Sequence, residues 1–247
     1  MATEYEAKFL NIPIDAVKRR LIECGAKQVH PPVKFYRAAF KLCSRKVKGY
    51  VRVRDEGNQV TMTAKIYRDD KFPEEYELTI KESLAVGIAF LNSLGLSQKA
   101  FQESFREKWS HPLAHEITFD ILPGLPIYME VDCTSEAKLN QLVELLKLDT
   151  KLQRFGAFDK TYLEYYGIPR DVINEKTKSL TFSKVAKELK PTKNKDLFDQ
   201  LVKLHLTIDK HYKNGTMDAF FAEYKKIDIA ILGGKKRIRS IRKKTKY

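Results

Sequence analysis

The sequence predicts an α+β protein: an eight-stranded antiparallel β-barrel with packing helices outside it, followed by a helical C-terminal extension. Three observations lead to this fold class. Residues 1–170 contain seven short segments in which charged and apolar side chains alternate, which is the pattern of β-strands. Three longer stretches in the same part have apolar residues at helical spacing. After Arg170 the alternation stops, and apolar residues recur at helical spacing in a lysine-rich background.

The two parts of the chain also differ in charge. The formal net charge is +14, and residues 171–247 carry 20 Lys and Arg against 9 Asp and Glu. Residues 1–170 therefore have a basic excess of only three, so the chemistry of the first part does not follow from the overall basic charge. We place a domain boundary at residue 170, because Gly167 and Pro169 interrupt the chain there.

Each predicted strand places its charged side chains on one face. Acidic and basic positions are separated by strand: Glu75 and Glu77 form one pair, and Arg52 and Arg54 another. A solvated sheet face explains a single strand of this kind more simply, but it does not explain the segregation across seven strands. The charged positions that we single out are Glu4, Glu6, Lys8, Arg52, Arg54, Lys65, Glu75, Glu77, Arg106, Lys108, Glu116, Asp120, Glu130 and Asp132.

About eight strands is the size at which an antiparallel sheet can close around one small ligand. If the charged faces point inward, the apolar faces need cover from outside. Three predicted helices supply it: residues 13–25, residues 82–94 and a helix with Ser135 as its N-cap. In the extension we expect helical hairpins with a turn at Asn214-Gly215.

A barrel interior with charges of both signs needs a ligand that satisfies them, because isolated buried charges are costly. A triphosphate suits the lysines and arginines, which bind phosphate oxygens. The carboxylates would repel such a ligand, so we expect them to hold hard divalent cations, Mg²⁺ or Mn²⁺. The sequence contains no GxxxxGK[ST] or GxGxxG phosphate loop and no HExxH zinc motif.

The residues Glu4-x-Glu6-x-Lys8 match the ExExK motif of the CYTH superfamily, the triphosphate tunnel metalloenzymes. The order of the later charged positions, from Arg52-x-Arg54 to Glu130-x-Asp132, also resembles this family. The segments Pro123-Gly124-Leu125-Pro126 and Tyr165-Tyr166-Gly167-Ile168 look like those of bacterial class IV adenylyl cyclases. The resemblance covers about residues 3–168 and implies an eight-stranded antiparallel tunnel for a triphosphate.

The resemblance also implies roles for individual residues. Four carboxylates resemble the metal ligands of the family: Glu4, Glu6, Glu130 and Asp132. Five cations resemble its phosphate-binding residues: Lys8, Arg52, Arg54, Lys65 and Arg106. We expect Lys8 and Glu6 to be catalytic.

The charged faces supply further candidates. Glu75, Glu77, Glu116 and Asp120 are added as metal ligands, and Lys108 as a phosphate-binding residue. The sequence departs from the family at two positions. Ser104 stands where relatives often carry a basic residue, which removes a phosphate contact, and Asp132 stands where Glu is common, which shortens one ligand.

The same tunnel supports more than one reaction. In an adenylyl cyclase, the ribose 3′-hydroxyl attacks the α-phosphorus of ATP and pyrophosphate leaves. In a phosphohydrolase, water attacks the terminal phosphorus of tripolyphosphate, thiamine triphosphate or a nucleoside triphosphate. A non-catalytic nucleotide or polyphosphate sensor is a third reading. The resemblance favours the cyclase.

The remaining expectations concern location and partners. Three cysteines without a CxxC pair, no signal peptide and no transmembrane-length apolar run predict a cytoplasmic protein. The tail from Lys235 to Lys246 has eight Lys or Arg and no acidic residue. It is either solvated or makes a weak contact with nucleic acid or an anionic surface. The helical extension could also support a homodimer.

Overall fold

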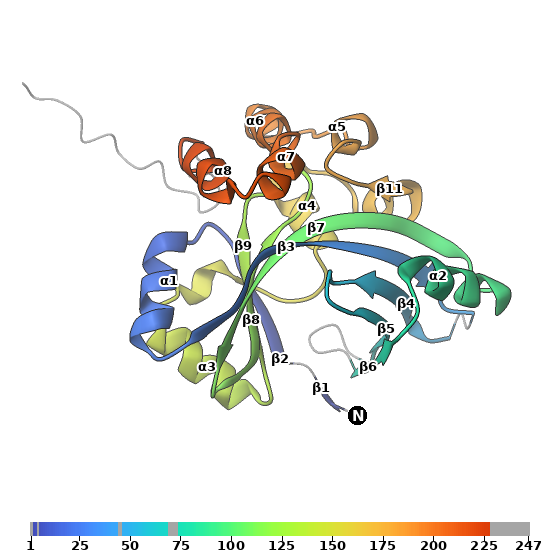
Figure 1. Cartoon of the computed structure of the whole chain (residues 1–247), viewed down its shortest axis with the longest axis horizontal. Coiled ribbons are helices and arrows are strands. Elements are labelled where there is room, and N and C mark those ends of the chain that lie inside the picture. Colours follow the sequence, from blue (N-terminus) through green and yellow to red (C-terminus); the bar gives the residue numbers. More distant parts are fainter. Residues whose placement is uncertain (1, 4, 44–45, 69–73, 228–247) are drawn as a thin grey trace, which may run out of the picture.

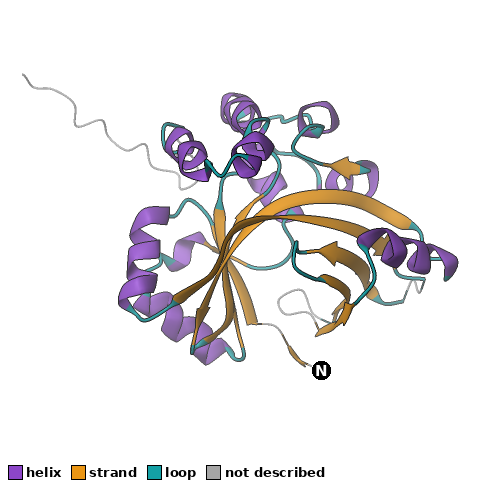
Figure 2. Cartoon of the chain, in the orientation of Figure 1, coloured by secondary structure: helices purple, strands orange, loops and turns teal. Residues whose placement is uncertain are grey.

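The computed structural model describes residues 2–3, 5–43, 46–68 and 74–227. They form one strongly curled antiparallel sheet, with helices on its convex side and a group of C-terminal helices at one end (Figures 1 and 2). The strands of five or more residues are β2 (Tyr5–Phe9), β3 (Lys27–Lys41), β4 (Lys48–Asp55), β5 (Val60–Tyr67), β6 (Glu74–Ile80), β7 (Gln98–His111), β8 (Ala114–Ile121) and β9 (Tyr128–Cys133).

Two long strands, β3 and β7, form the spine of the sheet (Figure 1). One end of β3 pairs with β4, and the sheet continues through β5 to β6. The other end of β7 pairs with β8, and the sheet continues through β9 to β2. We call these the β4–β6 wing and the β8–β2 wing. Because the wings leave opposite ends of the spine, they curl toward each other and enclose a concave face.

The predicted α+β class and antiparallel curled sheet are confirmed, with one difference in closure. The described strands form a half-barrel, and its edges approach each other only at the N-terminal segment. There β1 (Ala2–Thr3) pairs with β6 over two residues, while β2 pairs with β9. Two further two-residue strands extend the sheet, β10 (Gln153–Arg154) beside β2 and β11 (Ser179–Leu180) beside β7.

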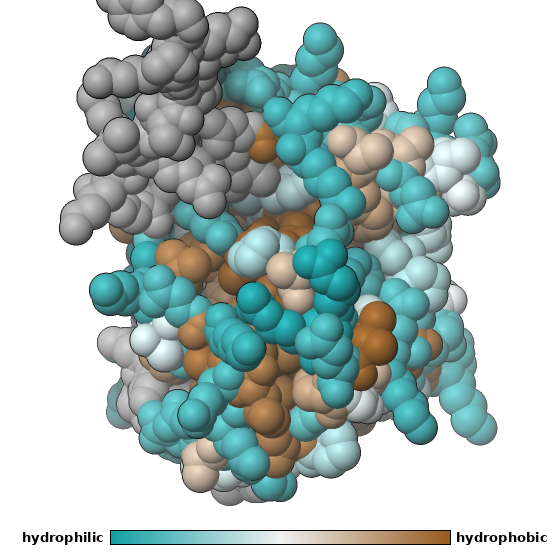
Figure 3. All heavy atoms as spheres, turned by 90° about the vertical axis from the view of Figure 1, so that its left-hand side faces the viewer, coloured by the Kyte–Doolittle hydropathy of each residue, from teal (hydrophilic) through white to brown (hydrophobic). Residues whose placement is uncertain are grey.

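The three predicted packing helices are present: α1 (Ile14–Glu23), α2 (Leu84–Ser93) and α3 (Glu136–Leu145). Ser135 caps α3, since its Oγ accepts a hydrogen bond from the Lys138 amide at 3.3 Å. Helices α1 and α3 cover the β8–β2 wing and α2 covers the spine beside β4 (Figure 1). The face with α1 and α3 is viewed in Figure 3, where apolar side chains lie among hydrophilic ones.

The apolar residues that alternate with the predicted charged positions lie on the convex face. Ala7, Phe9, Val131 and Met129 are fully buried under α1 and α3, while their charged neighbours in sequence point the other way. A second, smaller core around Val53 lies under α2. The charged faces are therefore on the concave side of the sheet.

The chain after β9 folds as short helices. They are η1 (Thr150–Leu152), α4 (Asp159–Tyr166), the π-helical turn η2 (Val172–Lys176), α5 (Val185–Glu188), α6 (Lys195–His205), α7 (Ile208–Lys213) and α8 (Met217–Tyr224). The predicted turn at Asn214-Gly215 separates α7 from α8, and Gly215 has φ +66°.

The C-terminal helices and the sheet share one hydrophobic core. Leu201 and Phe220 belong to the same buried cluster as Met129 of β9. The turn at Gly124 joins the two parts: the Gly124 amide donates to His205 Nδ1 at 3.0 Å, and Tyr166 Oη donates to the Gly124 carbonyl at 2.5 Å. Gly124 has φ +77°, and a Cβ there would lie 2.8 Å from the Phe198 ring. The boundary at residue 170 stays a prediction.

Two further expectations concern membrane-spanning helices and the basic C-terminal tail. In the part that the structure describes, no helix has both the length and the apolar character needed to cross a membrane. The basic tail, residues 235–246, lies outside the described residues.

Candidate functional site

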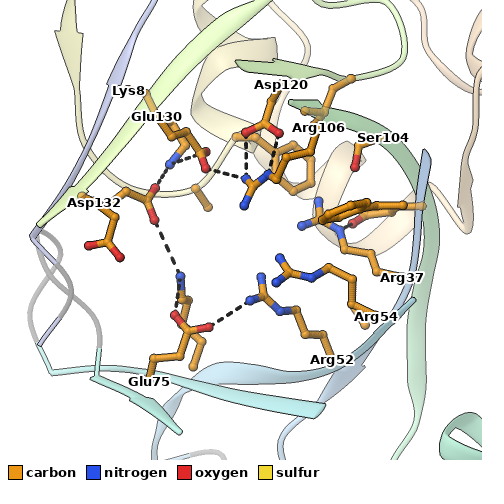
Figure 4. Close-up of a pocket in the computed structure, with 18 of the residues that line it drawn as sticks. Lys8, Arg37, Arg52, Arg54, Glu75, Ser104, Arg106, Asp120, Glu130 and Asp132 are labelled. Atoms are coloured by element: carbon orange, nitrogen blue, oxygen red, sulfur yellow. Dashed lines mark hydrogen bonds and ion pairs between the residues drawn. The ribbon is translucent and has the colours of Figure 1, made fainter. Parts of the chain in front are cut away.

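The concave face of the sheet encloses a cavity of about 640 Å³. The structure brings thirteen of the fourteen predicted charged residues to its wall, and the fourteenth, Glu4, lies outside the described residues. Figure 4 shows Lys8, Asp120, Glu130 and Asp132 converging from the β8–β2 wing, Arg37 and Arg106 from the spine, and Arg52, Arg54 and Glu75 from the β4–β6 wing. The thirteen are Glu6, Lys8, Arg52, Arg54, Lys65, Glu75, Glu77, Arg106, Lys108, Glu116, Asp120, Glu130 and Asp132.

Three carboxylates form a row across the β8–β2 wing. Asp132 of β9 is in register with Glu6 of β2 on one side and with Glu116 of β8 on the other. Burial and the nearby charges of Glu6 and Glu116 raise the pKa of Asp132 to about 7. Its Oδ1 is buried and has no hydrogen-bond partner among the described residues. This carboxylate row therefore carries negative charge that the surrounding residues do not fully compensate.

Lys8 lies one step along the same wing and opposite Glu130. Its Nζ forms ion pairs with Glu6 and, at 3.0 Å, with Glu130. Burial opposes the charge of Lys8, but Glu130 and Glu6 outweigh it and raise its pKa. Burial likewise opposes the charge of Glu130, yet Lys8 and Arg106 hold its pKa well below the usual range. Lys8 is therefore a permanent cation beside the carboxylate row.

Arg106 of β7 is the most heavily paired cation of the site. Its guanidinium contacts both carboxylate oxygens of Asp120 at 2.7 Å and also binds Glu116 at 3.0 Å and Glu130 at 2.8 Å. Burial would raise the pKa of Glu116, but Arg106 and Lys108 lower it to about 2. Residues predicted to bind phosphate and residues predicted to bind metal therefore neutralise each other here.

On the β4–β6 wing, Arg52 and Lys65 share Glu75. Arg52 Nη2 lies 2.9 Å from Glu75 Oε1, and Lys65 Nζ lies 3.1 Å from Glu75 Oε2. Lys65 also reaches Glu6 of the opposite wing at 3.8 Å. Glu77 is more exposed and lies 3.4 Å from Arg52. Lys65 is therefore the cation that links the two wings.

Arg37 of β3 is a cavity residue that the sequence analysis missed. It is in register with Arg54 on β4 and with Gln102 on β7, and its Nε donates to Gln102 Oε1 at 2.5 Å. Its guanidinium lies 4.8 Å from the centre of the Phe158 ring. Burial and neighbouring arginines lower the pKa of both Arg37 and Arg54. The signal in the sequence was a single arginine within the otherwise apolar and aromatic run 35–40 of β3.

The arginine side of the cavity has an excess of positive charge. Arg54 pairs with Glu56 at 2.5 Å, whereas Arg37 has no carboxylate partner in the described chain. Ser104, where a basic residue was expected from the family pattern, lies on this side beside Arg37 (Figure 4). An anion with several oxygens fits between these arginines.

The residues of the carboxylate row suit a hard divalent cation. Carboxylate oxygens are the ligands that Mg²⁺ and Mn²⁺ prefer, and the buried Asp132 Oδ1 is free to serve as one. Within the described ranges, no three acidic, histidine or cysteine side chains already converge closely enough to hold a metal. Glu6 instead turns to Lys8. Metal binding would thus require Glu6 to exchange an ion pair for a metal bond.

Comparison with known proteins gives similarity of fold only. No protein-family model and no curated protein matches the chain. A solved structure of a proposed adenylate cyclase from Vibrio parahaemolyticus has a TM-score of 0.55 at 13% identity, over 64% of this chain and 97% of that one. A conserved hypothetical protein from Pyrococcus furiosus has a TM-score of 0.51 at 17% identity, over 61% and 94%. The PH1819 protein from Pyrococcus horikoshii OT3 has a TM-score of 0.50 at 18% identity, over 65% and 98%.

Proposed function

We propose that this chain is a divalent-metal-dependent enzyme that acts on a triphosphate, and that its reaction is that of an adenylyl cyclase. One observation carries the proposal: a single cavity holds the carboxylate row of the β8–β2 wing together with arginines of the spine and the β4–β6 wing. A metal-bound triphosphate complements this lining, because its phosphate oxygens bind cationic side chains and its metal ion binds carboxylates.

Two further observations support the proposal. The ExExK motif and the order of the later charged positions resemble the CYTH superfamily, and in the structure the described residues of that pattern line one cavity. The Vibrio parahaemolyticus protein of similar fold is itself a proposed adenylate cyclase. The proposal of a cyclase over a triphosphatase rests on that likeness and on the sequence segments around Gly124 and Tyr166.

The residues of the chain divide the work as follows. Arg37, Arg52 and Arg54 bind phosphate oxygens from the spine and the β4–β6 wing. Lys8, which stays protonated, neutralises charge on the phosphate nearest the carboxylate row and is not a proton acceptor. Mg²⁺ or Mn²⁺ at the carboxylate row, with Glu6 and Asp132 as ligands, would neutralise charge that develops on the phosphates.

The cavity wall also has room for an organic group. Phe35 and Phe158 line it beside the arginines, and the Phe35 ring centre lies 5.5 Å from the Arg54 guanidinium. A nucleoside attached to the triphosphate would find aromatic surface there. In the cyclase reaction its 3′-hydroxyl oxygen bonds to the α-phosphorus, the bond from that phosphorus to the bridging oxygen of the leaving pyrophosphate breaks, and the hydroxyl proton passes to solvent.

The test is to incubate the protein with ATP, tripolyphosphate or thiamine triphosphate in the presence of Mg²⁺ or Mn²⁺ and to resolve the products. We expect cyclic AMP and pyrophosphate from ATP. Orthophosphate as the product would indicate a triphosphatase instead of a cyclase. Tight binding without turnover would indicate a sensor. Lys8→Met and Glu6→Gln should abolish turnover, while Lys187→Gln on the exposed side of α5 should not. Full activity of the first two variants would contradict the site.

A further inference from the structure

A second, smaller cavity of about 270 Å³ opens beside the main one. The two cavities share the side chains of Tyr50, Tyr67, Lys99 and Asn174 in their walls. The second cavity is built by β4, β5 and β7 together with residues 156–175, the segment that leads from the sheet to the C-terminal helices. None of the thirteen described residues of the charged strand pattern lines it.

The second cavity is lined by lysines that lack acidic partners. Lys48, Lys99 and Lys160 reach its wall, and none of the three forms an ion pair with any described residue. Lys99 Nζ makes one hydrogen bond, to Asn174 Oδ1 at 3.4 Å. Lysines on a protein surface need no partner, but Lys99 and Lys160 are only partly exposed, so their charges are partly withdrawn from water.

Both carboxylates of the second cavity pair with other cations, although the buried Asp159 Oδ1 has no hydrogen-bond partner among the described residues. Asp159 is buried, and its Oδ2 accepts hydrogen bonds from Arg170 Nε at 2.6 Å and from Asn174 Nδ2 at 2.7 Å. Glu175 is paired with Lys41. Burial accordingly lowers the pKa of Lys99, and Glu175 and Asp159 offset it only in part. The cavity is therefore left with an excess of positive charge, which suits a small oxyanion.

The inward-facing side chains of β4 lead from the main cavity into the second. Arg54, Arg52, Tyr50 and Lys48 occupy alternate positions of β4 and so share its concave face. Tyr50 is in register with Lys65, the cation that links the two wings, and Lys48 is in register with Tyr67. A chain of phosphates that is bound by Arg52 and Lys65 and extends past Tyr50 would therefore approach Lys48, Lys99 and Lys160.

We propose that the second cavity is an anion subsite for one more phosphate group than a triphosphate carries. Its ligand is the next unit of a linear inorganic phosphate chain whose other units lie in the main cavity. This inference rests on the proposed function, because it takes the main cavity to bind a triphosphate. Free orthophosphate has the same chemistry, so the experiment must separate the two sources.

The experiment measures binding of linear tetraphosphate, tripolyphosphate and orthophosphate to the full chain by titration calorimetry with Mg²⁺. The test variant is Lys48→Gln with Lys160→Gln, and the matched control is Lys187→Gln with Lys203→Gln, which removes the same charge from α5 and α6. We expect the wild type to bind tetraphosphate more tightly than tripolyphosphate. The test variant should lose about tenfold in tetraphosphate affinity and keep its affinity for tripolyphosphate, and the control should lose neither.

Three results would overturn the subsite. They are equal affinity of the wild type for the two chains, equal losses in the test and control variants, or lysine-dependent orthophosphate binding without preference for the longer chain. Lys99→Met is a second variant for the same comparison, and thermal melting verifies that each variant is folded. Arg52→Met separates the two proposals. If tripolyphosphate binds and Arg52→Met abolishes the binding, the main cavity is a triphosphate site whether or not the subsite exists; if the wild type binds neither chain, the proposed function itself fails.

Discussion

Glu6 and Asp132 occupy matched positions on the adjacent strands β2 and β9, so two carboxylates enter the cavity at the same level. Glu116 continues the row on β8. Like charges at matched positions of neighbouring strands are destabilising, and a hydrophobic or amide side chain would fold better there. The row is thus a feature that costs stability in the metal-free protein, as expected of a ligand site.

Asp132→Asn should stabilise the metal-free protein at alkaline pH. The folded-state pKa of Asp132 is raised to about 7, so between about pH 4 and pH 7 the folded protein holds a proton that the unfolded chain releases. The free energy of unfolding therefore falls as the pH rises through this window. The substitution should remove this fall and raise the melting temperature at pH 8, by on the order of 1–2 kcal/mol in stability. Melting curves in EDTA at pH 4.5 and pH 8 test this; parallel pH profiles for the two proteins would contradict it.

Binding of Mg²⁺ or Mn²⁺ should release a proton at pH 6. A metal ligand must be ionised, and Asp132 is largely protonated below its raised pKa of about 7. Calorimetric titration in two buffers of different ionisation enthalpy measures the number of protons released. Asp132→Asn should lose the release and most of the metal affinity, whereas Asp218→Asn, on an exposed position of α8, should change neither. Metal binding without proton release would argue that Asp132 is not a ligand.

Substitutions of Arg37 and Arg106 should affect ligand affinity and the free energy of unfolding differently. Arg106→Met leaves Asp120 and Glu130 buried without their shared cation, which should cost about 3–5 kcal/mol of stability. Arg37→Met removes a cation that has no carboxylate partner in the described chain, so its cost in stability should be about 1 kcal/mol. Its affinity for tripolyphosphate should nevertheless fall about tenfold. Denaturant unfolding measures the free energy of unfolding, and ligand titration measures the affinity for tripolyphosphate. An unchanged affinity of the Arg37→Met protein would show that Arg37 does not bind the ligand.

His205 should make the protein less stable in acid. Burial lowers its pKa to about 3, and its Nδ1 accepts the Gly124 amide. Between about pH 6.5 and pH 3 the unfolded chain binds a proton that folded His205 excludes, so the free energy of unfolding falls as the pH is lowered. Asn can place its Oδ1 where Nδ1 lies. His205→Asn should therefore reduce the fall in the free energy of unfolding between about pH 6.5 and pH 3, measured by denaturant unfolding at several pH values. If the fall is the same in the variant and the wild type, groups other than His205 cause it.

The faces of the strands and the outer helices follow from the sequence because each depends on local periodicity. Alternation places Glu130 and Asp132 on one side of β9 and Val131 on the other, whatever the rest of the chain does. The length of β3 could not be predicted in this way. Its ladder with β7 is irregular between Gln28 and Val33, where Pro31 and Pro32 lack the amide hydrogens for regular pairing.

Partners within the cavity depend on register between distant strands, which periodicity does not encode. Arg106 was expected to bind phosphate and Asp120 to bind metal, yet the two lie opposite each other on β7 and β8 and pair directly. Arg37 was not predicted because its inward neighbours on β3 are Phe35 and Ala39. The strand therefore has no alternating charged pattern around Arg37. The openness of the half-barrel follows from two long spine strands that carry their wings at opposite ends.

The pairing of β2 with β9 has a consequence for how the protein folds. These strands are separated by more than a hundred residues of chain, and the carboxylate row exists only once they meet. During synthesis β2 is made early and can pair only after β9 has been made. Contacts between residues so far apart in the sequence make folding slow. Ligand binding therefore reports complete assembly of the sheet, and a refolding chain should regain its near-native secondary structure before it regains affinity.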